Sequence, residues 1–135
     1  MPKNSGEPLL RRLRALADEP AEQAAYARHL LQTEKDKQAL EAALRVLQDF
    51  PVPENHPLLV ELYHQLAENG PRRDPGMYLR AALLRALRPV ARHTDLPLVE
   101  GAALTYEPMP SRHDAEGAEL RALALSLMND LDERL

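Results

Sequence analysis

Apolar residues recur along this chain with the spacing of amphipathic helices. Over residues 34–50, an apolar face lies opposite Glu41, Arg45 and Gln48 when successive residues are placed about 100° apart. That face holds Ala39, Leu40, Ala43, Leu44, Val46, Leu47 and Phe50. Similar patterns predict about seven helices in all, the others at residues 8–17, 20–33, 55–69, 77–92, 95–107 and 115–133. The fold class is therefore predicted to be all-α.

Proline, asparagine and aspartate mark the expected ends of these helices. Pro51 ends the third helix, while Asn55 and Asp95 are placed to cap the fourth and the sixth. Pro89 lies inside the fifth helix, where it removes a hydrogen bond and predicts a kink in the last turn. Residues 70–76, rich in proline, glycine and arginine, are expected to form a turn.

Short strings recur at a spacing of about 40 residues, which is typical of helical solenoids. The matched strings are LEAAL at 40–44 with LRAAL at 79–83, LVE at 59–61 with LVE at 98–100, and LRA at 79–81 with LRA at 120–122. Their offsets are 39 (79 − 40), 39 (98 − 59) and 41 (120 − 79) residues. The usual product of such an architecture is a binding surface for another molecule.

The string LRAALLRALRPVARHTDLPLVEG at residues 79–101 resembles HEAT repeats of the short bacterial, PBS-lyase-like type. The matching residues are Leu79, Arg80, Ala82, Pro89, Asp95, Pro97, Leu98, Val99 and Glu100. Residues 39–69 match less well, because Glu41 replaces the arginine and the turn lacks the aspartate. Residues 118–133 match only the first helix of a third repeat, and residues 8–33 would be a degraded pair acting as a cap.

This resemblance implies a short right-handed α-solenoid of antiparallel helix pairs. It would form a single domain over residues 8–135, after a flexible tail at residues 1–7. Relatives of this type usually bind other proteins along the concave face made by the second helix of each pair. The resemblance also implies that Arg80, Asp95 and Arg121 are structural positions that bridge successive repeats. An ordinary helical bundle is the alternative fold.

The composition agrees with a helical core. Of the 135 residues, 44% are hydrophobic but only 4% are aromatic, so the core must consist of leucine and alanine, both strong helix formers. Residues 1–8 lack the apolar stretch of a signal peptide, and no run approaches the roughly 18 apolar residues of a membrane span. We therefore expect a cytoplasmic protein that does not enter the membrane.

No pattern in the chain matches a catalytic or metal site. The absence of cysteine excludes disulfides, thiolate metal ligands and cysteine nucleophiles. The motif Glu61-x-x-His64 is one half of a di-iron site, and no second copy occurs. Nucleophile motifs of the G-x-S-x-G type and glycine-rich phosphate loops are also missing. We expect no catalytic residues, no metal and no cofactor.

Charge is unevenly distributed along the chain. Residues 72–92 carry six arginines against one acid, whereas residues 114–133 carry six acids against one base. The arginines that could bind a partner are Arg72, Arg73, Arg85, Arg88 and Arg92. They could instead form a solvated face that pairs with nearby acids. Tyr78 is the only aromatic residue near them, which provides poorly for base stacking.

The last predicted helix is apolar on more than one side. Its main stripe comprises Leu120, Leu123, Leu127 and Leu131, and Leu125 and Met128 lie outside it. These two residues could contact a second copy in a symmetric dimer or a different partner. Alternatively, the short N-terminal helix or a loop folds over them.

Three functions are consistent with these patterns. The leading hypothesis is a non-enzymatic protein-interaction or scaffold module whose partner is another protein. The alternative is binding of a nucleic-acid backbone through the Arg-rich fifth helix, as in HEAT-like alkylpurine glycosylases, although a net charge of −4 disfavours it. A lyase or glycosylase relative is the third. The sequence does not decide whether the concave face or an end of the stack binds.

Overall fold

The computed structural model describes residues 6–108 and 117–133, and this part of the chain folds entirely into helices and loops. Its eight α-helices are α1 (Glu7–Ala15), α2 (Pro20–Thr33), α3 (Lys37–Asp49), α4 (Asn55–Ala67), α5 (Gly70–Arg73), α6 (Tyr78–Leu87), α7 (Leu96–Ala103) and α8 (Ala118–Glu133). Three 3-10 turns lie at Pro75–Met77, Arg88–Val90 and His93–Asp95. The all-α prediction is confirmed. Most of the predicted tail and of the loop before α8 lies outside the described residues.

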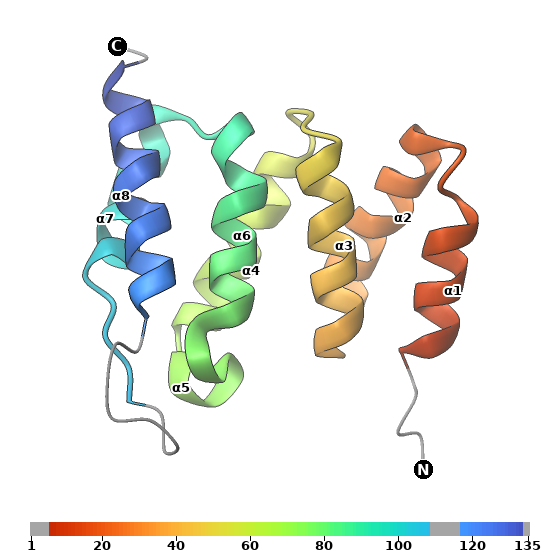
Figure 1. Ribbon diagram of the computed structural model, residues 1–135, viewed down its shortest axis with the longest axis horizontal. Coiled ribbons are helices and arrows are strands. Elements are labelled where there is room, and N and C mark those ends of the chain that lie inside the picture. Colours follow the sequence, from red (N-terminus) through yellow and green to blue (C-terminus); the bar gives the residue numbers. More distant parts are fainter. Residues whose placement is uncertain (1–5, 109–116, 134–135) are drawn as a thin grey trace.

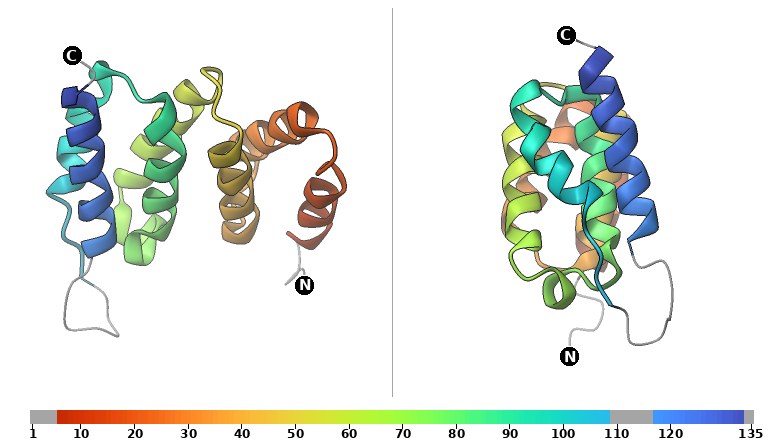
Figure 2. Two further views of the ribbon diagram at one scale, coloured as in Figure 1. Left: turned by 45° about the horizontal axis from the view of Figure 1, so that its top comes forward. Right: turned by 90° about the vertical axis from the view of Figure 1, so that its left-hand side faces the viewer.

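The helices form two layers that follow the order of the chain (Figure 1). Helices α1, α3, α6 and α8 run in one direction in the first layer, and α2, α4 and α7 run in the other direction behind them. The end-on view in Figure 2 shows the two layers edge-on. Within this arrangement α2 packs chiefly on α3, α4 on α6, and α7 on α8. Each helix of the second layer thus packs against the helix of the first layer that follows it in the chain.

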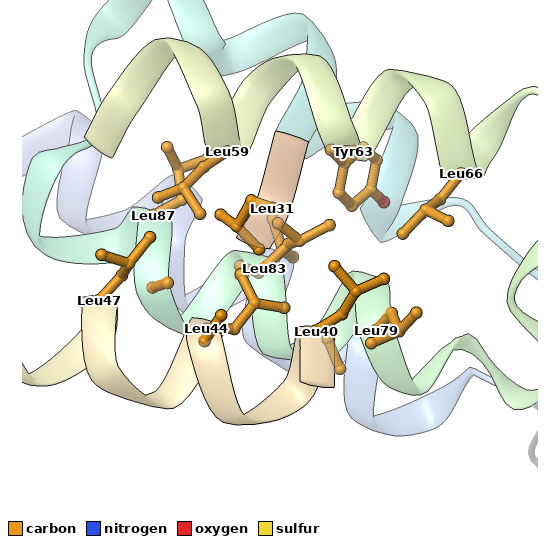
Figure 3. Close-up of a cluster of buried hydrophobic side chains, with 14 of the residues drawn as sticks. Leu31, Leu40, Leu44, Leu47, Leu59, Tyr63, Leu66, Leu79, Leu83 and Leu87 are labelled. Atoms are coloured by element: carbon orange, nitrogen blue, oxygen red, sulfur yellow. The ribbon is translucent and has the colours of Figure 1, made fainter. Parts of the chain in front are cut away.

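The core is made of leucine and alanine, as the composition predicts. Figure 3 shows α3, α4 and α6 turning leucines toward one another, with Leu31 of α2 inserted among them. The apolar face predicted for α3 is buried at Ala39, Leu40, Ala43, Leu44 and Leu47. Each fully buried leucine stabilises the fold by about 1.5–3 kcal/mol. Buried alanines such as Ala43 and Ala86 let neighbouring helices approach closely.

Residues 70–76 differ from the predicted turn, because they contain α5 and most of a 3-10 turn. Within this segment, the buried carboxylate of Asp74 accepts hydrogen bonds from the backbone N–H groups of Leu79 and Arg80, both at 2.9 Å. These bonds satisfy donors at the start of α6. Gly76 and Met77 have φ angles of 82° and 64°, so a tight left-handed turn joins α5 to α6.

Two further helix ends differ from expectation. Helix α6 ends at Leu87 in place of kinking, since Pro89 has no N–H to continue the ladder and residues 88–90 form a 3-10 turn. Asn55 does not cap α4 with its side chain. It is buried at the first position of α4, where its Nδ2 donates to the carbonyl of Phe50 at 2.9 Å and its Oδ1 accepts from Arg28 at 3.0 Å. Asn55 therefore ties the end of α3 to α2.

Candidate protein-interaction site

Two of the predicted partner-binding arginines are engaged within the fold. Arg85 of α6 forms an ion pair with Glu119 of α8. Arg88 donates to the Oδ1 atom of Asp130 at 3.2 Å, and this hydrogen bonding raises the pKa of Arg88. The first pair connects α6 to α8, and the second connects the 3-10 turn after α6 to α8. For these arginines the structure favours pairing with nearby acids.

The other three arginines do not extend these two into one basic face. Arg72 and Arg73 belong to α5, while Arg92 follows the 3-10 turn at the far end of α6 (Figure 1). The ten residues of α6 separate the two places by about 15 Å. Arg73 donates to the carbonyl of Gln65 at 2.7 Å, and its Nη1 atom lies 3.5 Å from Glu68. The five arginines are therefore spread along α6 and beyond both of its ends, and their binding of a partner stays a prediction.

Arg80 lies at the centre of a buried charge network. Its Nε donates to Asp74 at 2.9 Å, and its two terminal nitrogens donate to the carboxylate of Glu107 at 2.7 and 2.6 Å. Burial acts to lower the pKa of Arg80, but the hydrogen bonds to Glu107 and Asp74 outweigh it and raise the pKa. Arg80 thereby links α6 to the segment that follows α7. This contact is architectural, since almost none of the guanidinium is exposed.

Asp95 and Arg121 also connect elements that are distant in the sequence. Asp95 contacts His56 of α4 and accepts from the backbone N–H of Arg92 at 2.7 Å. Arg121 of α8 donates to the carbonyl of Thr105 at 2.9 Å. Arg80 and Asp95 therefore have separate partners.

Sequence reasoning missed three residues of these networks, namely His56, Asp74 and Glu107. His56 could have been found from the sequence, because it precedes Asp95 by 39 residues, the offset of the repeated strings.

A groove of about 430 Å³ opens where two successive helix pairs meet. It lies at the end of the layers where α2 and α4 finish and α3 and α6 begin. Five leucines line it: Leu31, Leu40, Leu62, Leu66 and Leu79. Except for Leu62, which is half-buried, these leucines belong to the buried core, so the groove has an apolar floor. We call this site the basic-rimmed groove.

The rim of the groove is cationic. Lys35, Lys37 and Arg73 line it against a single acid, Glu34. Both lysines are exposed. Asp36, which lies between them, caps α3 by accepting the backbone N–H of Ala39 at 3.0 Å. Arg73 is paired with Glu68, so the two exposed lysines are the cations of the rim that would favour an acidic ligand.

A second cavity of about 430 Å³ lies between α3 and α6, on the outer side of the first layer. It is lined by Glu41, Leu44, Arg45, Gln48, Tyr78, Ala82, Arg85 and Glu119. Its charges balance, because two acids face two arginines and Arg85 is paired with Glu119. This cavity therefore has no net charge to select a ligand.

The α7–α8 end of the molecule exposes apolar side chains. Leu125 is 59% exposed, as expected from its place outside the main stripe of α8, whereas Met128 packs partly on the core. Leu104 and Tyr106, which follow α7, are 76% and 71% exposed. Helix α1 lies at the opposite end of the molecule and does not cover these residues (Figure 1).

The predicted absence of a metal site can be compared with the described residues. Within them, no group of three or more histidine, aspartate or glutamate side chains is arranged to hold a metal ion. Glu61 and His64 are both exposed on α4. None of the helices in residues 6–108 and 117–133 is long and apolar enough to cross a membrane.

Comparison of the chain with protein-family models, curated proteins and solved structures finds no match.

Proposed function

We propose that this chain is a non-enzymatic protein-interaction module, built as a short HEAT-like α-solenoid, that binds an acidic segment of a partner protein. The observation that carries the proposal is the basic-rimmed groove, with its leucine floor and the exposed Lys35 and Lys37 on its rim. The two-layered order of the helices and the 39-residue offsets support the solenoid architecture.

The groove suits an amphipathic helix or turn with leucines on one face and carboxylates on the other. Apolar side chains of the ligand would cover the floor, in the way that helix-in-groove complexes use i, i+3 and i+4 anchors. Carboxylates would meet Lys35 and Lys37 at the rim, where they add specificity and speed association. A smaller hollow beside the groove is lined by Leu58 and Glu61 of α4.

A fluorescence-anisotropy titration tests the proposal with a labelled peptide of about three helical turns that carries leucines on one face and glutamates on the other. We expect the peptide to bind. The variant Lys35→Glu/Lys37→Glu should weaken binding by at least about tenfold at low salt. The matched control, Arg11→Glu/Arg14→Glu on α1, changes the net charge equally and should leave binding within about twofold.

Two results would overturn the proposal. One is equal affinity for a peptide in which lysines replace the glutamates, since the rim would then not select for charge. The other is a shift of short duplex DNA at low salt that the Lys35→Glu/Lys37→Glu variant abolishes, which would assign the rim to a phosphate backbone.

A further inference from the structure

Four residues on one edge of α8 are spaced symmetrically along the helix. Arg121, Leu125, Met128 and Asp132 lie at positions i, i+4, i+7 and i+11, which places them within an arc of about 60° on the helix. The separations from cation to leucine and from methionine to carboxylate are both four residues (125 − 121 and 132 − 128). We call these four residues the α8 edge.

We propose that the α8 edge binds the α8 edge of a second copy of this chain, with the two helices antiparallel. This site is separate from the basic-rimmed groove and does not depend on the proposed function. In an antiparallel pair centred between Leu125 and Met128, each leucine faces the other copy's methionine. Arg121 then faces the other copy's Asp132, and symmetry makes every contact twice.

The exposure of the edge supports this pairing. Leu125 is 59% exposed, and Asp132 is exposed in the last turn of α8. Met128 is half-buried and offers its outer side. Leu104 and Tyr106 extend the apolar surface beyond the edge, since Tyr106 lies directly beneath the guanidinium of Arg121. Figure 2, right, shows that α7 and α8 together form this end of the molecule.

Charge selects the antiparallel second copy over other occupants. The guanidinium of Arg121 is held in place, because it donates to the carbonyl of Thr105 at 2.9 Å and lies 3.7 Å from the centre of the Tyr106 ring. Asp132 lies near the C-terminus of α8, where the helix dipole disfavours a carboxylate and a facing cation relieves the repulsion. A parallel pair would set like charges against each other, and a uniformly acidic or basic partner would repel one end of the edge.

Analytical ultracentrifugation of the full chain tests the pairing. The wild-type protein should show a concentration-dependent monomer–dimer equilibrium. The single variants Arg121→Glu and Asp132→Arg should each raise the dimer dissociation constant by at least about tenfold. The double variant Arg121→Glu/Asp132→Arg should restore most of the dimer, because it exchanges the two charges across the symmetry axis. Loss of folding cannot produce this rescue.

Two lysine substitutions at exposed residues test where on the surface the contact lies. Leu125→Lys should disrupt the dimer, whereas Tyr78→Lys, which alters an exposed residue of α6 outside the α8 edge, should not. Lys35→Glu/Lys37→Glu should leave the dimer intact, so a failed groove experiment and a failed dimer experiment remain distinguishable. A wild-type chain that stays monomeric, or a double variant no better than the single ones, would overturn the proposal.

Discussion

The Nε2 atom of His56 on α4 lies 2.8 and 2.9 Å from the two carboxylate oxygens of Asp95, which precedes α7 and lies 39 residues further along the chain. Because a carboxylate only accepts hydrogen bonds, Nε2 must carry the hydrogen that joins them. Both side chains are buried. Two successive helix pairs are thus joined at the interval at which the strings in the sequence recur.

We predict that Asp95→Ala strongly destabilises the fold. The change leaves His56 and the backbone N–H of Arg92 without their buried acceptor. The expected loss is about 2–4 kcal/mol in the free energy of unfolding, measured by urea denaturation. Glu100→Ala, on the exposed side of α7, is the control and should change stability by less than about 0.5 kcal/mol. Equal effects of the two changes would contradict a structural role for the pair.

Removing the charge of Arg80 should cost more. Arg80→Met leaves the buried carboxylate of Asp74 and the half-buried carboxylate of Glu107 without their cation, so we expect a loss of about 3–5 kcal/mol. Arg80→Lys keeps the charge but loses the planar fork and should fall between Arg80→Met and the wild type. Arg85→Met breaks a partly exposed pair and should cost no more than about 1 kcal/mol. Thermal unfolding followed by circular dichroism compares the stability of the three variants. An Arg80→Met variant that is no less stable than Arg80→Lys or Arg85→Met would argue against a structural role for the Arg80 charge.

Two glycines should respond in opposite directions to the same change. A Cβ atom on Gly70 would overlap the Arg80 guanidinium and the Glu107 carboxylate, so Gly70→Ala should lower stability by at least about 1 kcal/mol. A Cβ atom on Gly101 meets nothing within 4 Å, and this residue lies inside α7. Gly101→Ala should therefore raise stability by about 0.5–1 kcal/mol, because alanine favours the helix. Urea midpoints that move the same way in both variants would refute the prediction.

Alkaline pH should destabilise the protein through Tyr63. Burial raises the pKa of Tyr63 to about 12 from an ordinary value of 10.0, so the folded state resists ionisation of the phenol. The unfolded chain loses this proton first, and stability therefore falls as the pH rises from about 10 to about 12. The contribution of this residue amounts to about 2–3 kcal/mol across that window.

Unfolding experiments between pH 8 and about 11.5 test the role of Tyr63 against that of Tyr78, which is exposed. Tyr63→Phe should flatten the alkaline decline, and Tyr78→Phe should leave it unchanged. An identical pH profile for the wild type and Tyr63→Phe would show that another group is responsible.

The long helices could be predicted because their apolar spacing is local information. The face of α3 is buried at the positions that its pattern marks, and α2 begins at Pro20 and ends at Thr33 as predicted. The region before α6 could not be predicted in this way. There Asp74 bonds the start of α6 and the Arg80 side chain, which also reaches Glu107, 27 residues further along the chain.

In the candidate sites, too, local features could be predicted from the sequence and contacts between distant residues could not. The sequence correctly set Leu125 apart from the main stripe of α8, because that property follows from helical periodicity. The runs of arginine and of acid were both visible, but their pairing across 42 residues at Arg88 and Asp130 was not. Lys35 and Lys37 lie at the start of the helix predicted over residues 34–50, but the leucine floor beside them comes from four different helices, so no local pattern brings these residues together.

By itself, the sequence determined that this protein is all-α, with a leucine and alanine core and repeats about 39 residues apart, because helix propensity and periodicity depend only on neighbouring residues. The tertiary structure alone decided which charges neutralise one another. Those outcomes depend on distances between residues that become neighbours only after the two layers have packed.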